Sequence, residues 1–128
     1  MPERDATVSA LLLAELMAWH QKSLGELLGV LHAEFGEFRY GRIDLDVKPG
    51  QKEQAIAYFS SEKTKRLGDW HVTRRENLDG SKLYLDDMGW VMVRASGTEN
   101  LLRIYAETPR AESTKRVLDA TVDVVQSL

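Results

Sequence analysis

Apolar residues recur three or four positions apart over the first 35 residues, which predicts two amphipathic helices. The stripe of the first helix is formed by Val8, Leu12, Leu13, Leu16, Met17, Trp19 and His20. The second helix is expected to begin at Ser23, because Ser23-Leu24-Gly25-Glu26 has the form of a capping box, and to end at Gly36. Two helices of this size cannot bury their apolar faces on each other completely. We therefore expect residues 1–37 to form a helical unit that packs on something else.

A different pattern begins near residue 38, with apolar and polar residues alternating as in half-buried strands. Asp79-Gly80 is a strong hairpin signal, because both central residues of the favoured turn need a positive φ. Thr108 is placed to cap a final helix, with Pro109 at its first position. The expected elements are strands over 43–47, 70–77, 82–85, 90–94 and 101–107, and helices over 51–60 and 108–128. Residues 38–128 are thus predicted to be an α+β domain, an antiparallel sheet with helices packed on one face.

Composition excludes several classes of function. The chain of 128 residues carries 17 Lys+Arg against 20 Asp+Glu, and the net charge of -3 argues against nucleic-acid binding. Because the chain has no cysteine, disulfides and Cys-ligated metals are excluded. The longest unbroken apolar run, residues 10–14, is too short for a membrane span, and no secretory signal is visible at the start. We therefore expect a soluble cytoplasmic protein with no membrane or nucleic-acid partner.

One segment carries candidate chemistry, the polar stretch from Arg94 to Asn100 followed by Arg103. Ser96 and Thr98 can donate hydroxyl hydrogen bonds, and Gly97 allows backbone amides to converge on an anion. The two arginines supply the planar guanidinium groups that suit a phosphate. The segment contains no nucleophile beside a base, so it predicts binding and no catalytic residue. From composition alone, a solvated loop with its arginines paired to Glu99 or Glu107 is favoured about equally.

A resemblance favours the phosphate interpretation. Residues 93–107, from Val93-Arg94-Ala95-Ser96-Gly97-Thr98-Glu99-Asn100 to Glu107, closely resemble the C-terminal phosphate-binding loop of the α-D-phosphohexomutases, the phosphoglucomutase/phosphomannomutase family. By this resemblance residues 1–37 correspond to the helical end of the family's third domain. Residues 38–128 correspond to its fourth domain, which has a TATA-binding-protein-like fold. Ala95 and Asn100 stand where proline is usual in the family, and neither change removes a donor.

The resemblance implies roles for individual residues. Arg94, Ser96, Gly97, Thr98 and Arg103 match positions that hold the phosphate of a phosphosugar, and Glu99 matches a position that shapes the loop. The implied protein is an isomerase that transfers a phosphoryl group between the 1- and 6-positions of a hexose phosphate. Its fourth domain clamps the phosphate that is not transferred. The implied partners are a hexose 1- or 6-phosphate and the remaining domains of the same enzyme.

The parts of the family's reaction site that would supply the chemistry are missing from this chain. No Ser-His pair of the phosphoserine type occurs, and there is no Asp-x-Asp-x-Asp loop for Mg²⁺. The nearest acidic strings, Asp44-Leu45-Asp46 and Asp86-Asp87, lack the third ligand that an octahedral site needs. We therefore expect no metal or other cofactor in this chain, Mg²⁺ only in the full-length enzyme, and no mutase activity from these residues alone.

Other features have simpler explanations. His20, His32 and His71 have no metal-ligand spacing, and Trp19, Trp70 and Trp90 are typical of core or interface anchors. The basic cluster 63–66 is typical of a solvated helix end or loop. The alternative to an enzyme domain is a stand-alone, non-enzymatic module that binds phosphate or a partner. The sequence does not distinguish glucose, mannose and glucosamine as the sugar.

Overall fold

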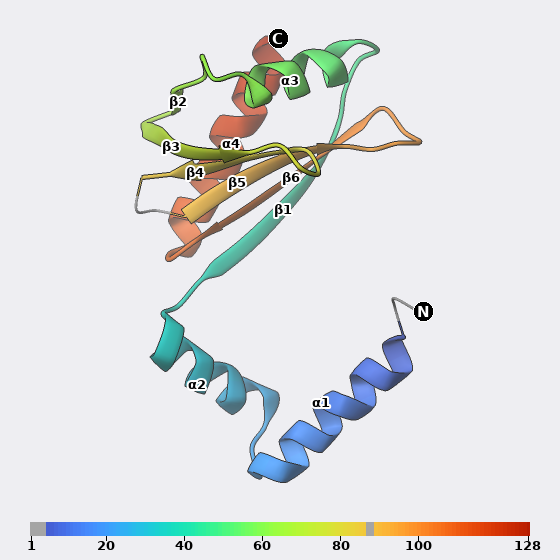
Figure 1. Ribbon diagram of the computed structural model, residues 1–128, viewed down its shortest axis with the longest axis vertical. Coiled ribbons are helices and arrows are strands. Elements are labelled where there is room, and N and C mark those ends of the chain that lie inside the picture. The colour runs from blue at the N-terminus through green and yellow to red at the C-terminus, as the bar shows by residue number, and fades with distance from the viewer. Residues whose placement is uncertain (1–4, 87–88) are drawn as a thin grey trace. The chain divides into compact units, whose positions relative to one another are not determined.

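A computed structural model of the chain describes residues 5–86 and 89–128. It contains two compact units, Met1–Glu37 and Phe38–Leu128, which are described separately (Figure 1). Within the described residues, no helix is long and apolar enough to cross a membrane.

The first unit contains the two expected helices, α1 (Ala6–His20) and α2 (Leu24–Phe35). Asp5 caps α1, because its Oδ1 accepts a hydrogen bond from the Val8 amide at 2.9 Å. The capping box of α2 is confirmed: Ser23 Oγ accepts from the Glu26 amide, and Glu26 Oε2 accepts from the Ser23 amide at 2.8 Å. The hydrogen bonds from Ser23 lower the pKa of Glu26.

Neither helix of the first unit has a buried residue. Most of their large apolar side chains are exposed, Trp19 to 81%, and only Met17 of α1 and Leu27 of α2 are partly buried among them. Trp19 therefore contributes no core here, in contrast to Trp70, which is buried in the second unit. Caps and backbone hydrogen bonds define these helices, and their apolar stripes are not covered within the unit.

The second unit confirms the predicted fold class, an α+β arrangement with an antiparallel sheet. The strand order is β1-β6-β5-β4-β3-β2, so the first strand pairs with the last (Figure 1). The described strands are β1 (Arg39–Asp46), β2 (Arg66–Leu67), β3 (Trp70–Glu76), β4 (Ser81–Leu85), β5 (Gly89–Ala95) and β6 (Leu101–Thr108). The helices are α3 (Gln51–Ser60), between β1 and β2, and α4 (Ala111–Ser127) at the end of the chain.

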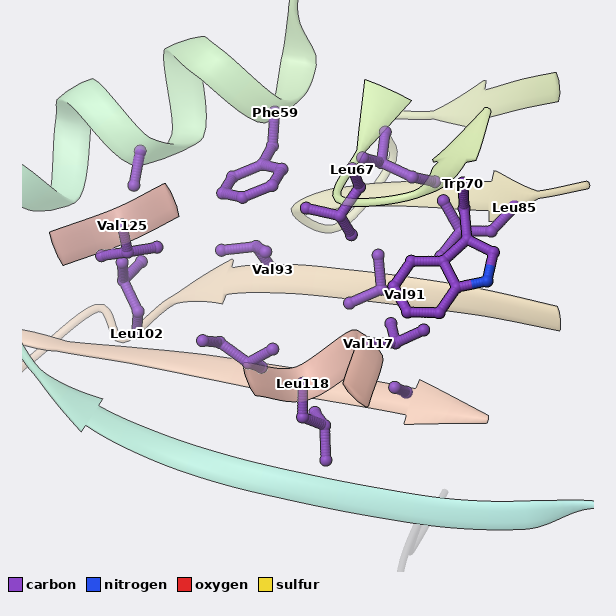
Figure 2. Close-up of a cluster of buried hydrophobic side chains, with 14 residues drawn as sticks. Phe59, Leu67, Trp70, Leu85, Val91, Val93, Leu102, Val117, Leu118 and Val125 are labelled. Carbon is purple, nitrogen blue, oxygen red and sulfur yellow. The ribbon is translucent and has the colours of Figure 1, made fainter. Parts of the chain in front are cut away.

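The core lies between α3, α4 and a single face of the sheet. Side chains alternate along β5 and β6, so that Val91, Val93, Leu102 and Ile104 are fully buried while the residues between them are exposed or partly exposed. Phe59 from α3 and Val117, Leu118 and Val125 from α4 pack over them (Figure 2). The opposite face of the sheet is left open and carries polar and aromatic side chains.

A buried arginine joins α3 to the sheet. The Arg75 side chain is only 6% exposed and lies on β3. Its Nε donates to the Phe59 carbonyl at 2.8 Å and its Nη2 to the Thr64 carbonyl at 2.6 Å. A positive charge at the C-terminal end of a helix is favourable because the carbonyls there are otherwise unpartnered. Arg75 therefore fixes the end of α3 and the start of the segment that follows it.

The structure differs from the sequence-based expectations at the element ends. The first strand begins at Arg39 and not at residue 43, and β2 was not predicted. The β3–β4 connection spans residues 77–80, with a positive φ at Gly80 but not at Asp79, so the predicted two-residue turn is wrong. Gly80 is needed there because a Cβ would lie 2.6 Å from the Val93 carbonyl oxygen.

The predicted cap of the final helix is also wrong. Thr108 is the last residue of β6 and pairs with Arg39 in β1, so it does not precede the helix directly. Its Oγ1 donates to the Arg110 carbonyl at 2.8 Å and lies 2.9 Å from Thr114 Oγ1. The N-cap of α4 is Arg110, which makes no side-chain capping bond. The hydroxyl of Thr108 therefore links the end of β6 to the first turn of α4.

We predict that Gly89→Ala destabilises the second unit strongly. Gly89 has a φ of 125°, and a Cβ there would lie 2.0 Å from the Glu107 carbonyl oxygen across the ladder. The expected loss in the free energy of unfolding is about 2 kcal/mol or more, measured by urea denaturation. Gly97→Ala is the control, because a Cβ at residue 97 meets nothing within 4 Å. Equal urea midpoints for the two variants would contradict the close approach at Gly89.

We also predict that residues 38–128 fold without residues 1–37. Every buried apolar residue of the described chain lies between Ala55 and Val125, so deleting the first unit removes nothing from this core. The truncated chain should keep a cooperative thermal transition and dispersed amide NMR signals. A molten spectrum, with poorly dispersed signals and no transition, would show that the core depends on the first unit.

Candidate functional site

The candidate site lies at the end of the β5–β6 hairpin. The loop of residues 96–100, called here the 96–100 loop, connects the two strands. The Ser96 amide donates to the Leu101 carbonyl at 2.9 Å, which closes the base of the loop. The Val47 amide donates to the Asn100 carbonyl at 3.0 Å, which ties the loop to the chain just beyond β1. The base of the loop is therefore held on both sides by backbone hydrogen bonds.

The pairing register places Arg94 directly opposite Arg103. Their neighbours Val93 and Ile104 point into the core, so both arginines project from the open face of the sheet. Like charges directly opposite each other in an antiparallel pair repel. Such a pair needs negative charge close by, from the chain's own carboxylates or from a bound anion.

Carboxylates of the chain lie beside both arginines. Arg94 Nε is 3.2 Å from Asp79 Oδ1, in the 77–80 connection, and Arg103 Nη2 is 4.0 Å from Glu99 Oε2. Both carboxylates are well exposed, at 66% and 65% of their side-chain surface. Exposed ion pairs contribute only about 0–1 kcal/mol, so an incoming dianion can compete with these carboxylates. The Arg103–Glu99 pair matches the alternative expected from composition, in which the loop arginines pair with loop acids.

Arg103 is the more enclosed of the two arginines. Its side chain is 33% exposed, against 44% for Arg94. Its Nε is buried and has no hydrogen-bond acceptor among the described residues. A guanidinium group has five N–H donors, and the single distant contact with Glu99 uses few of them. Apart from the buried Nε, the guanidinium donors of Arg103 are therefore largely unused by the described residues.

Asp44 of β1 lies beside the arginine pair, because it is opposite Arg103 in the pairing of β1 with β6. Both of its oxygens accept hydrogen bonds from Arg42, from Nε and Nη2, each at 2.6 Å. These bonds hold the pKa of Asp44 below its usual range, with a smaller contribution from the charge of Arg103, and they raise the pKa of Arg42. Asp44 is therefore a fixed negative charge at the edge of the arginine pair.

The other predicted phosphate ligands lie in the 96–100 loop itself. Ser96 is buried at 4% exposure, whereas Gly97, Thr98 and Glu99 are exposed. No residue of the loop has a φ in the left-handed region, so the αR–αL form of backbone anion nest is absent. Thr98 therefore lies on the accessible part of the loop. Gly97 does not adopt the positive φ that its residue type allows.

Lys52 belongs to this site and was not selected from the sequence. It lies in the first turn of α3, and its Nζ donates to the Ser96 carbonyl at 3.1 Å and to the Glu99 carbonyl at 3.2 Å. No spacing in the sequence relates Lys52 to a loop 44 residues further on. The contact arises because β1 pairs beside β6, which brings the start of α3 to the end of the sheet where the loop lies.

His71, Asp86 and Trp90, which the sequence analysis also considered, belong neither to the 96–100 loop nor to the arginine pair. The described residues contain no group of three or more His, Cys, Asp or Glu side chains that could hold a metal ion. His71 pairs with Asp86, and its Nε2 lies 2.7 Å from Arg66 Nη1. Asp87, the second residue of one acidic string, lies outside the described residues. Trp90 lies on the open face beneath Lys82, whose Nζ is 4.0 Å from the indole ring.

Comparison with known proteins gives one family. Residues 72–124, which include β5, β6 and the 96–100 loop, match the family model described as the phosphoglucomutase/phosphomannomutase C-terminal domain. A phosphoglucomutase/phosphomannomutase of Thermococcus kodakarensis is 28% identical over 123 residues, which are 96% of this chain and 25% of the relative. A probable phosphoglucosamine mutase of Methanopyrus kandleri is 30% identical over 122 residues, again 25% of its length.

A phosphoglucosamine mutase of Polynucleobacter asymbioticus is 29% identical over 121 residues and 23% of its length. The chain thus spans about a quarter of the length of these curated relatives. The similarity extends over nearly the whole chain, and the family match covers the hairpin that carries the paired arginines. The chain is therefore similar over nearly its whole length to a quarter of these mutases, and its residues 72–124 match the C-terminal domain of phosphoglucomutases/phosphomannomutases.

Proposed function

We propose that residues 38–128 clamp the phosphate of a hexose phosphate while a longer mutase moves a phosphoryl group between the 1- and 6-positions of the sugar. The observation that carries this proposal is the pair Arg94 and Arg103, directly opposite each other on an open sheet face beside the 96–100 loop. Ser96, Gly97 and Thr98 complete the proposed phosphate ligands, and Glu99 shapes the loop. The substrate class is taken from the similarity to phosphoglucomutases, phosphomannomutases and phosphoglucosamine mutases.

In this proposal the bound phosphate replaces Asp79 and Glu99 as the partner of the two arginines. Each guanidinium group can donate two parallel hydrogen bonds to phosphate oxygens, which fixes orientation as well as charge. A phosphate held away from the reacting centre supplies binding energy that orients the reactive hydroxyl. Phosphoryl transfer depends mainly on such positioning and charge stabilisation, so a domain without a nucleophile can still raise the rate.

The proposal assigns the chemical step to parts of the longer protein. The described residues offer no metal-ion cluster, so they do not fit the Mg²⁺ that the family's reaction implies. No step of the clamp depends on a metal. The exposed apolar stripes of α1 and α2 are proposed to be covered by the remaining domains of the same cytoplasmic enzyme.

We predict that the 128-residue chain binds inorganic phosphate in the millimolar range. Amide NMR titration should show shifts that cluster on residues 96–99 and on Arg94 and Arg103. Arg94→Gln should weaken phosphate binding about tenfold, because it removes charge-assisted hydrogen bonds worth about 1.5 kcal/mol or more.

Arg74→Gln is the matched control for this titration. Arg74 is another exposed arginine of the sheet, and it pairs with the carboxylate of Glu76. It lies on β3 opposite Tyr84 of β4, which in turn lies opposite Trp90, so Arg74 is at the other end of β5 from the 96–100 loop. It should change phosphate affinity less than twofold. The clamp proposal fails if phosphate shifts no loop amide, or if both variants lose affinity equally through the general charge of the protein.

We further predict that this chain alone has no mutase activity at any Mg²⁺ concentration, because its sequence lacks the phosphoserine segment and its described residues form no metal site. The measurement is conversion of glucose 1-phosphate, mannose 1-phosphate or glucosamine 1-phosphate to the 6-phosphate by the purified 128-residue chain. Turnover that survives repurification and is lost in Arg94→Gln would contradict the proposal that the chemical step depends on other parts of the longer protein.

A further inference from the structure

We propose that Lys52 is a positioning residue for phosphate binding, which fastens the backbone of the 96–100 loop so that its donors face the ligand. This inference rests on the proposed function above. Its basis is the pair of hydrogen bonds from Lys52 Nζ to the carbonyls of Ser96 and Glu99, at 3.1 and 3.2 Å. These two carbonyls flank Gly97-Thr98, so one ammonium group holds both ends of the segment that is expected to contact phosphate.

The loop needs such a restraint. It contains no proline, and its second residue, Gly97, has open space around it and the largest backbone freedom of any residue type. The backbone bonds at Ser96 and Asn100 hold only its base. Among the described residues, the other hydrogen bonds to the loop backbone from outside the hairpin are the two that Lys52 donates. A loop that is ordered before binding loses less entropy when the ligand arrives.

Lys52 itself is held in place. The side chain of the preceding residue, Gln51, accepts a hydrogen bond from the Lys48 amide at 3.1 Å and donates to the Val125 carbonyl of α4 at 2.8 Å. One turn further on, Ala55 is fully buried in the core. The start of α3 therefore cannot shift without disturbing both α4 and the core, which makes Lys52 a fixed point of attachment.

The charge of Lys52 also suits an anion site. Carbonyl oxygens carry partial negative charge and repel a phosphate dianion, so the Ser96 and Glu99 carbonyls must be turned away from the ligand or neutralised. Lys52 neutralises them, because its ammonium group donates a hydrogen bond to each of the two oxygens. Its compact ammonium group brings a third positive charge to the loop that joins the arginine strands. Lys52 thus acts on phosphate through the loop, whereas Arg94 and Arg103 are placed to contact it.

The test compares Lys52→Met, Lys52→Arg and Lys48→Met in the 128-residue chain. Lys52→Met keeps the length and apolar stem of the side chain but removes the donors, and Lys52→Arg keeps both charge and donors. Lys48 is an exposed lysine in the segment before α3 whose side chain binds no loop carbonyl, so Lys48→Met removes the same charge without loosening the loop. Because Lys52 is half-buried, Lys52→Gln serves as a second, smaller change if Lys52→Met lowers the thermal midpoint.

Two quantities are measured for each variant: the dissociation constant for inorganic phosphate, and the order of amides 97–99 without phosphate, from ¹⁵N relaxation. Lys52→Met should weaken phosphate binding about tenfold and lower the order of these amides, since it removes two charge-assisted hydrogen bonds. Lys52→Arg should stay within about threefold of the unchanged chain, and Lys48→Met within about twofold.

The outcomes separate the two proposals. If the unchanged chain shows no phosphate-dependent shifts, the phosphate clamp is overturned, and this inference with it. If the unchanged chain binds phosphate and Lys52→Met behaves as Lys48→Met does, the clamp stands and the role of Lys52 is overturned. Weaker binding with unchanged order of amides 97–99 would also overturn it, because Lys52 would then act by charge alone.

Discussion

The pairing register between β5 and β6 is the constraint on which the rest of the site depends. It sets Val93 beside Ile104 on the face that α3 and α4 cover, and Arg94 beside Arg103 on the open face. A shift of one residue in either strand would turn its apolar side chains to solvent and its arginine into the core, at prohibitive cost. The hydrophobic core therefore fixes the position of the charged pair, although the two lie on opposite faces of the sheet.

The arginine pair Arg94 and Arg103 has a different environment from the buried arginine of the same sheet, Arg75. Two cations opposite each other repel, and the nearby carboxylates are exposed and placed at 3.2 and 4.0 Å, distances that leave guanidinium donors unused. By contrast, Arg75 is buried and donates to two carbonyls, which joins α3 to β3. The same residue type thus occurs in two different environments on one sheet, and its hydrogen-bond partners distinguish them. Arg75 lacks accessible donors, whereas Arg94 and Arg103 present theirs on the open face.

The features that the sequence predicted are those determined by nearby residues. The capping box at Ser23, the helix over 51–60 and the alternation in β5 and β6 depend on spacings of two to four residues, and the structure has them. The errors occur where distant contacts compete with local preferences. Thr108 was expected to cap a helix but pairs with Arg39 in the sheet, and Asp79 does not adopt the expected turn conformation. The position of Arg94 opposite Arg103 follows from two correctly predicted strands, whereas no local pattern identifies Lys52.

The place of Lys52 follows from the strand order. In a simple meander β1 would lie beside β2, but here the first strand pairs with the last, so its end and the start of α3 lie next to the 96–100 loop. A residue near the beginning of the domain thereby reaches a loop near its end, and α4 fixes the same helix turn through Gln51 and Val125. The loop that carries the candidate phosphate ligands is consequently held by segments from across the whole domain. This arrangement explains how an exposed, glycine-containing loop can keep a defined shape, because the covered side of the sheet and its helices supply the rigidity that the loop sequence lacks.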